Sequence, residues 1–264
     1  MTALGTFHGY GKELEEQLRA KTFPVAVKLL EREEDIPEGA VRPRRDLGYH
    51  LALCQAFSMS RRDGKLMAMV KEDNWCFEPV VGLGFAEPPQ YFLEGHNRFP
   101  ESALTLEVGS IWARGFPRLA PNKYMGIVSA PLMTANFKPD LVIIYCDSAQ
   151  LTLLLSAINC VHGHDLPCIL SGHAACVYAV VPVIQNRQYH VTSPCFGDSR
   201  RGMAQDNEII FSAPIEKVED LLIGLKHLVK CGMGMPRAMP IHPEFKLSES
   251  YAKIGRMIGL EIEQ

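Results

Sequence analysis

Eight cysteines are the residues of this 264-residue chain best suited to chemistry. A cysteine thiolate ligates metals and acts as a nucleophile. The chain has no Cys-x-x-Cys pair, which argues against thioredoxin-like, zinc-ribbon and ferredoxin sites. Four cysteines stand in the contexts of most interest, namely Cys54, Cys76, Cys176 and Cys195.

These four cysteines come from segments far apart in the sequence. Cys76 follows a polar loop beside Trp75, and Cys195 lies in a Gly-rich segment, 193–202, that we predict to be a loop. Cys54 and Cys176 lie on predicted helices, from which they can face those loops. Iron–sulfur ligation needs four thiolates that converge in space and not in sequence. The set therefore predicts a cluster, and three ligands alone would leave one iron open to substrate.

Two other interpretations of the cysteines stay open. In the first, they are small buried hydrophobic residues, which suits Cys146, Cys160 and Cys231 best because these lie in strand or helix contexts. In the second, Cys195 is a nucleophile whose pKa is lowered by the neighbouring arginines or by a histidine such as His173. No base stands at a fixed spacing from Cys195, which disfavours the nucleophile.

Arg200 and Arg201, within the same Gly-rich segment, are candidates for binding a small anionic ligand together with backbone N–H groups. His173, three residues before Cys176, is a third candidate for that role. The segment fits neither the P-loop nor the dinucleotide-binding pattern. A plain turn held by contacts between Asp198 and an arginine explains it equally well.

The composition is that of a globular protein, with 47% hydrophobic residues, 27 basic and 30 acidic residues and a net charge of −3. This balance disfavours a nucleic-acid partner. The longest apolar segments, near 141–145 and 151–158, are shorter than the roughly 18 residues of a membrane span. The first residues lack a basic stretch followed by an apolar one, so we expect a cytoplasmic protein, where disulfides are disfavoured.

The elements that must position the cysteines alternate between strands and helices. The apolar run at 141–146 is typical of a buried strand, Asp147 or Ser148 is a helix cap, and the following leucines repeat at helical spacing. This half of a βαβ unit predicts an α/β fold with a mixed, partly parallel sheet flanked by helices. We expect one domain over 1–231, then a Pro/Gly/Met-rich connector and a C-terminal helix over 232–264.

The other predicted elements follow from hydrophobic periodicity and turn residues. Helices are predicted over 9–21, 47–60, 101–115, 171–184 and 214–229, and strands over 24–30, 65–70, 126–131, 189–192 and 207–211.

The order of several short motifs resembles domain of unknown function 169, a family of bacteria and archaea that includes many anaerobes. The motifs are Cys54-Gln55, Cys76 before Gly82-Leu-Gly84, Ala130-Pro-Leu132, Lys138-Pro-Asp-Leu-Val-Ile-Ile144, Ser148-Ala-Gln150, Ala174-Ala-Cys176, Cys195-x-Gly197-x-x-Arg200 and Ala213-Pro214. The likeness runs from about Phe23 to Val229. It implies an α/β fold, marks Cys54 and Cys76 as recurring features and makes an oxygen-sensitive cluster more plausible, but it brings no established activity.

The sequence thus leads to one hypothesis and two alternatives. We expect a cytoplasmic iron–sulfur protein with a [4Fe–4S]-type cluster on Cys54, Cys76, Cys176 and Cys195, of the kind used in anaerobic metabolism. It would perform redox or cluster-assisted chemistry on a small anionic metabolite. The alternatives are a cofactor-free ligand-binding or accessory protein with structural cysteines and a cysteine-nucleophile enzyme. We expect no nucleic-acid or membrane partner, and a homo-oligomer stays open.

Overall fold

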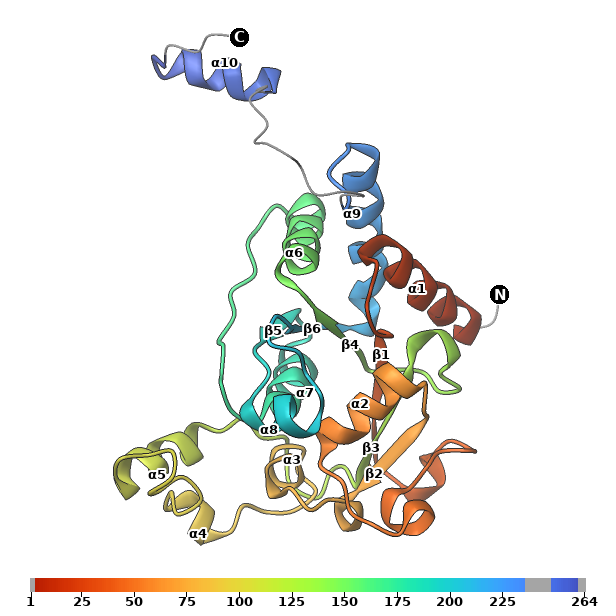
Figure 1. The fold of residues 1–264 in the computed structure, drawn as a ribbon, viewed down its shortest axis with the longest axis vertical. Helices are drawn as coiled ribbons and strands as arrows, with labels where there is room; N and C mark the ends of the chain where they lie inside the picture. Colours follow the sequence, from red (N-terminus) through yellow and green to blue (C-terminus); the bar gives the residue numbers. More distant parts are fainter. Residues whose placement is uncertain (1–2, 236–247, 261–264) are drawn as a thin grey trace.

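The computed structural model describes residues 3–235 and 248–260, and a six-stranded sheet forms the centre of this part of the chain (Figure 1). The strand order is β2-β3-β1-β4-β6-β5. The strands are β1 (Val25–Leu30), β2 (Met67–Val70), β3 (Gly126–Pro131), β4 (Leu141–Cys146), β5 (His190–Thr192) and β6 (Ile209–Pro214). Every neighbouring pair in this order is antiparallel.

The prediction of a partly parallel sheet is therefore wrong. Residues 141–158 do form a strand and a helix, β4 and then α6 (Ser148–His162), but two helices separate β4 from the next strand. The second, α7 (Ala175–Asn186), lies on the opposite face of the sheet from α6, so the chain does not complete a simple βαβ crossover. The unbroken apolar run of β4 arises because helices cover both faces of an antiparallel sheet.

Two hydrophobic cores lie on the two faces of the sheet. One face packs against α6 and two further helices, α1 (Ala3–Leu18) and α9 (Val218–Lys230). The other packs against α7, α2 (Leu53–Asp63), α3 (Phe77–Gly82) and an extension formed by α4 (Gln90–Leu93) and α5 (Leu106–Gly115). The short α8 (Phe196–Arg201) contacts α2. The second face therefore carries all the helices next to the four candidate cysteines.

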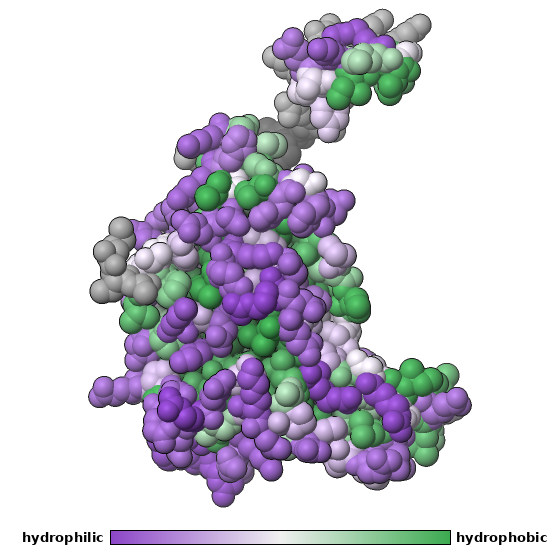
Figure 2. All heavy atoms as spheres, turned by 180° about the vertical axis from the view of Figure 1, so that it is seen from behind, coloured by the Kyte–Doolittle hydropathy of each residue, from purple (hydrophilic) through white to green (hydrophobic). Residues whose placement is uncertain are grey.

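The structure ends, in its described part, with α10 (Glu249–Met257), which confirms the predicted C-terminal helix. Most of the expected connector, at 236–247, falls outside the described residues. Seen from behind, apolar side chains are exposed on α10 and on the α4–α5 extension (Figure 2). No helix within 3–235 or 248–260 is both long and apolar enough to span a bilayer.

The predicted loop at 193–202 is also wrong, because α8 occupies most of it. Cys195 is the N-cap of α8, and its sulfur accepts a hydrogen bond from the backbone N–H of Asp198 at 3.4 Å. Arg200 and Arg201 lie in the last turn of α8, where the helix dipole favours positive charge. The glycines had suggested a loop, whereas cysteine capping and the basic last turn favour a helix.

A buried arginine fixes α2 to the end of α8 and to β6. The Arg61 side chain is fully buried and donates to Glu208 Oε1 at 3.1 Å. It also donates to the carbonyl oxygens of Gly202 at 3.3 Å and Met203 at 3.0 Å, and its guanidinium lies 4.0 Å from the centre of the Tyr145 ring. Because a buried charge needs partners, these contacts hold the three elements in one arrangement.

Arg61→Met should destabilise the fold, since Glu208 would be left as an unpaired buried charge. We expect the free energy of unfolding in urea to fall by about 3–5 kcal/mol. Lys226→Met, which breaks the surface ion pair with Glu13, is the matched control and should change stability little. A loss for Arg61→Met no larger than that of the control would contradict this role.

Candidate functional site

Each of the four candidate cysteines lies at the start of a helix. Cys54 is the second residue of α2 and Cys176 the second residue of α7. Cys76 and Cys195 are the N-cap residues of α3 and α8. The first-turn N–H groups of a helix lack intrahelical partners and carry partial positive charge. At three of these helix starts, backbone N–H groups of Gln55, Glu78 and Asp198 hydrogen-bond with the side chains of Cys54, Cys76 and Cys195.

The fold brings these four helix starts together. Helix α2 contacts both α7 and α8, and α7 contacts α3. The Cys54 sulfur lies 4.0 Å from the carbonyl oxygen of Gly197 in α8. Electrostatic interactions connect Cys176 with Cys54, Cys76 and Cys195, and connect Cys195 with both Cys54 and Cys76. Residues separated by up to 141 positions in the sequence thus form one group.

Two glycines allow this close approach. A Cβ on Gly82 would lie 2.5 Å from Cγ1 of Val177, the neighbour of Cys176, so glycine lets α3 sit on α7. A Cβ on Gly202 would lie 2.1 Å from Oδ1 of Asp198 and 3.0 Å from Cβ of Cys54. Glycine at these two positions therefore allows α3 to approach α7 and the end of α8 to approach α2.

Burial keeps Cys54, Cys76 and Cys176 protonated. It raises the pKa of Cys76 to about 12, and it also raises the pKa of Cys54 and of Cys176 well above the ordinary value. A negative charge on any of the other cysteines would raise the pKa of Cys176 more. Several thiolates can coexist here only if a positive centre lies among them, because a bound metal deprotonates its thiol ligands outright.

A buried carboxyl lies beside the cysteines. Asp198 is fully buried, its Oδ2 accepts from the Tyr145 hydroxyl at 3.0 Å, and its Oδ1 has no hydrogen-bond partner among the described residues. Burial raises the pKa of Asp198 to about 6. Sequence reasoning saw Asp198 only as a turn residue, although its position three residues after Cys195 is a capping spacing that marks it.

A second buried carboxyl, that of Glu78 in α3, interacts electrostatically with Arg98. Burial raises the pKa of Glu78, and the charge of Arg98 opposes that rise. The Arg98 guanidinium lies 4.3 Å from the Trp112 ring centre, and its Nε has no partner in the described part of the chain. Burial, followed by the charge of Arg98, lowers the pKa of His173, whose ring packs edge-on against Trp112 at 6.0 Å. No motif or spacing in the sequence marks Glu78 or Arg98.

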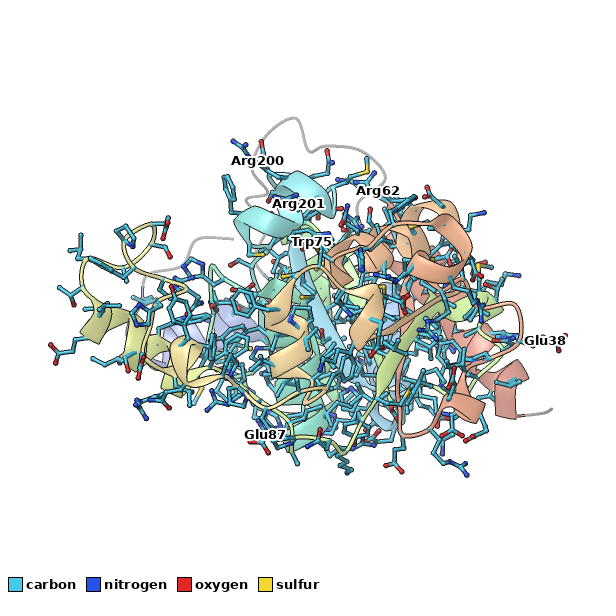
Figure 3. The ribbon with its side chains drawn as sticks, turned by 90° about the horizontal axis from the view of Figure 1, so that it is seen from below. Glu38, Arg62, Trp75, Glu87, Arg200 and Arg201 are labelled. Atoms are coloured by element: carbon cyan, nitrogen blue, oxygen red, sulfur yellow. The ribbon has the colours of Figure 1, made fainter. Side chains whose placement is uncertain are left out.

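The three expected anion-binding residues have different neighbours in the structure. Arg201 lies 4.5 Å from the Trp75 ring centre, and its charge lowers the pKa of Cys76 against the larger effect of burial. Arg200 lies over the Phe196 ring, also at 4.5 Å. Both arginines are exposed (Figure 3), whereas His173 packs with Arg98 and Trp112. Only Arg201 is thus connected to the cysteines by an electrostatic contact.

The four sulfurs do not form a ready-made site for a single ion. Within the described ranges, no group of three or more histidine, cysteine or acidic side chains is arranged to hold one metal ion. One tetrahedral zinc with Zn–S bonds of about 2.3 Å would require sulfurs roughly 3.8 Å apart. A cluster binds each cysteine to a different iron, so it accepts more widely spaced sulfurs.

The other cysteines have ordinary surroundings. Cys146 is buried in β4, with its sulfur 3.5 Å from the carbonyl oxygen of Ile209. Cys160 and Cys231 are exposed, so the expectation that they fill the core is wrong. Cys160 lies on the solvent side of α6, and Cys231 follows the last residue of α9. All eight cysteines, these included, are free thiols.

The comparisons with known proteins decide the family. The family model for domain of unknown function 169, described as uncharacterised ArCR, matches residues 13–224. The chain belongs to this family. A relative, an uncharacterised protein of Methanocaldococcus jannaschii, is 26% identical over 224 residues, which cover 82% of this chain and 91% of the relative. No solved structure matches the chain. The predicted resemblance is thereby confirmed, and the family description carries no activity.

Alkylation of the metal-free protein should follow burial. Iodoacetamide at pH 7 should label the exposed Cys160 and Cys231 first. Because its pKa rises from 9.0 to about 12, Cys76 should hold about a thousandfold less thiolate than an unperturbed thiol, and its labelling should speed up with rising pH. Peptide mass spectrometry over time measures each site. Equal rates at Cys76 and Cys160 would be inconsistent with this burial, and fast labelling of Cys195 alone would favour the nucleophile.

Proposed function

We propose that the chain is an iron–sulfur protein whose cluster is held by Cys54, Cys76, Cys176 and Cys195. The observation that carries the proposal is the gathering of four thiols, two buried and two partly exposed, from four separate helix starts into one electrostatically connected group. Four cysteine ligands are the usual set for a [4Fe–4S] cluster. Bound there, the cluster would supply one-electron transfer or, with one ligand released, a Lewis-acidic iron.

Charge supports this proposal. A cluster with four thiolate ligands carries a net negative charge, and helix N-termini stabilise negative charge. Hydrogen bonds to the ligand sulfurs tune the cluster potential, and the Asp198 N–H already donates to Cys195. Burial makes Cys54, Cys76 and Cys176 costly to ionise, and the iron core would provide the positive centre that favours their thiolates.

The four proposed ligands differ in their exposure to solvent. Cys54 and Cys176 are buried, whereas Cys76 and Cys195 are partly exposed. The two partly exposed cysteines face the side on which Arg201 and Trp75 lie. Exchange with solvent-borne reactants would therefore occur through Cys76 and Cys195. A small anionic metabolite at Arg200, Arg201 and His173 has weaker support, because only Arg201 among them has an electrostatic contact with a candidate cysteine.

A cofactor-free accessory protein is the second candidate. Its support is that a buried cysteine of this chain, Cys146 in β4, already serves as a packing residue. In that case the four thiols would serve only as packing residues, and replacing one would cost stability without a spectroscopic change. The two candidates thus differ in what a single cysteine substitution does.

Protein purified without oxygen should contain iron and acid-labile sulfide and absorb broadly near roughly 400 nm. Single alanine substitutions at Cys54, Cys76 or Cys176 should remove or strongly reduce this absorbance. Cys146→Ala is the matched control, since Cys146 is buried with a pKa also raised to about 12 but lies outside the group, and it should keep the chromophore. Iron-free protein, or equal loss in the control, would rule out the proposed cluster.

A further inference from the structure

A group of exposed aromatic, methionine and arginine side chains, together with the half-buried Arg62, lies beside the partly exposed cysteines. We call it the arginine–aromatic surface, and it consists of Arg62, Trp75, Phe77, Phe196, Arg200, Arg201 and Met203. Its apolar members are well exposed, from 46% for Trp75 to 71% for Phe196. Figure 3 shows Arg62, Trp75, Arg200 and Arg201 on one side of the molecule, while Glu38 and Glu87 lie at other edges.

The surface adjoins the cysteines through the chain itself. Trp75 directly precedes Cys76, and Phe196 directly follows Cys195. Arg201 adds an electrostatic contact with Cys76. The outermost side chains next to the proposed cluster are therefore those of the arginine–aromatic surface.

Ring contacts and hydrogen bonds hold these side chains in place. Two arginines lie over aromatic rings, Arg201 over Trp75 and Arg200 over Phe196. Trp75 Nε1 donates to Gln55 Oε1 at 3.1 Å, and Arg62 donates to the Met203 carbonyl oxygen at 2.8 Å. Side chains that are already ordered lose less entropy when a partner binds.

The composition of the surface fits a protein partner better than a small molecule. Tryptophan, phenylalanine, methionine and arginine are enriched at the centres of protein interfaces, and tryptophan and arginine dominate their binding energy. Five cavities of about 250 to 620 Å³ are formed by described residues, and none of these five is lined by a member of the group other than Arg62. The arginines also place positive charge on a chain whose net charge is −3.

We infer that the arginine–aromatic surface docks an acidic electron-carrier protein that exchanges one electron with the proposed cluster. This inference rests on the proposed function. In the exchange, one electron leaves the reduced carrier, which becomes oxidised, and enters the cluster, which becomes reduced; no covalent bond forms or breaks. Complementary charge steers such weak, fast complexes and makes their association depend on salt.

The test uses full-length, cluster-loaded protein and a purified acidic ferredoxin as the probe. Calorimetry should detect binding at low ionic strength that weakens as salt is raised. The double variant Arg200→Glu, Arg201→Glu should weaken binding about tenfold or more, as should Trp75→Ala. Lys123→Glu is the control, because Lys123 is an exposed cation beside the Tyr124 ring outside this surface, and it should bind as the parent does. No binding, or equal loss in the control, would overturn the inference.

Further measurements separate this inference from the cluster proposal. Ferredoxin binding is also measured on metal-free protein. Binding without iron would show a partner site in the absence of a cluster, whereas iron without binding would show a cluster in the absence of the partner site. Iron content and absorbance of the Arg200→Glu, Arg201→Glu variant show whether the cluster itself survives. Phosphate or citrate that binds equally well and displaces the ferredoxin would indicate a small-anion site instead. Binding of anionic-lipid vesicles in preference to the ferredoxin would indicate a membrane surface, and either result would overturn the docking inference.

Discussion

The rest of the structure depends on the close approach of four thiols, two buried and two partly exposed, at the starts of four helices. Burial disfavours ionisation of Cys54, Cys76 and Cys176, and each ionised cysteine would oppose the ionisation of the next. The helix starts that carry the four cysteines offer partial positive charge, yet the pKa values of Cys54, Cys76 and Cys176 stay raised. Protonated thiols are neutral, whereas four thiolates would need a cationic centre among the sulfurs, and the proposed iron–sulfur cluster would supply one.

The surrounding structure keeps that arrangement closed. The buried Arg61 connects α2 to Glu208 and to the chain after α8, while Gly82 and Gly202 allow the helices to approach. Asp198 and Glu78 add carboxyl groups whose pKa values burial raises, so the cysteines are bordered by groups that resist further negative charge. These features lie on one face of the sheet, and the α1, α6 and α9 face supplies a separate core.

The sequence predicted local elements better than their arrangement. The strand at 126–131 and the strand and helix around Asp147 follow from burial runs and a cap, and they are confirmed. The sequence did not predict the antiparallel sheet, because a strand covered on both faces is a continuous apolar run whether its neighbours are parallel or antiparallel. Helix α8 was missed because its cap is a cysteine, and the partners Glu78, Arg98 and Asp198 were missed because long-range contacts leave no periodic signal. The cysteine set itself came from context and family likeness, and its ligand role stays a prediction.

The most direct test of the central claim is an anomalous difference map at the iron absorption edge, from crystals of protein purified and kept without oxygen. The account predicts one compact group of iron peaks, within bonding distance of the sulfurs of Cys54, Cys76, Cys176 and Cys195. A map without iron at this place, in crystals of folded protein, would contradict it, as would iron bound elsewhere in the chain.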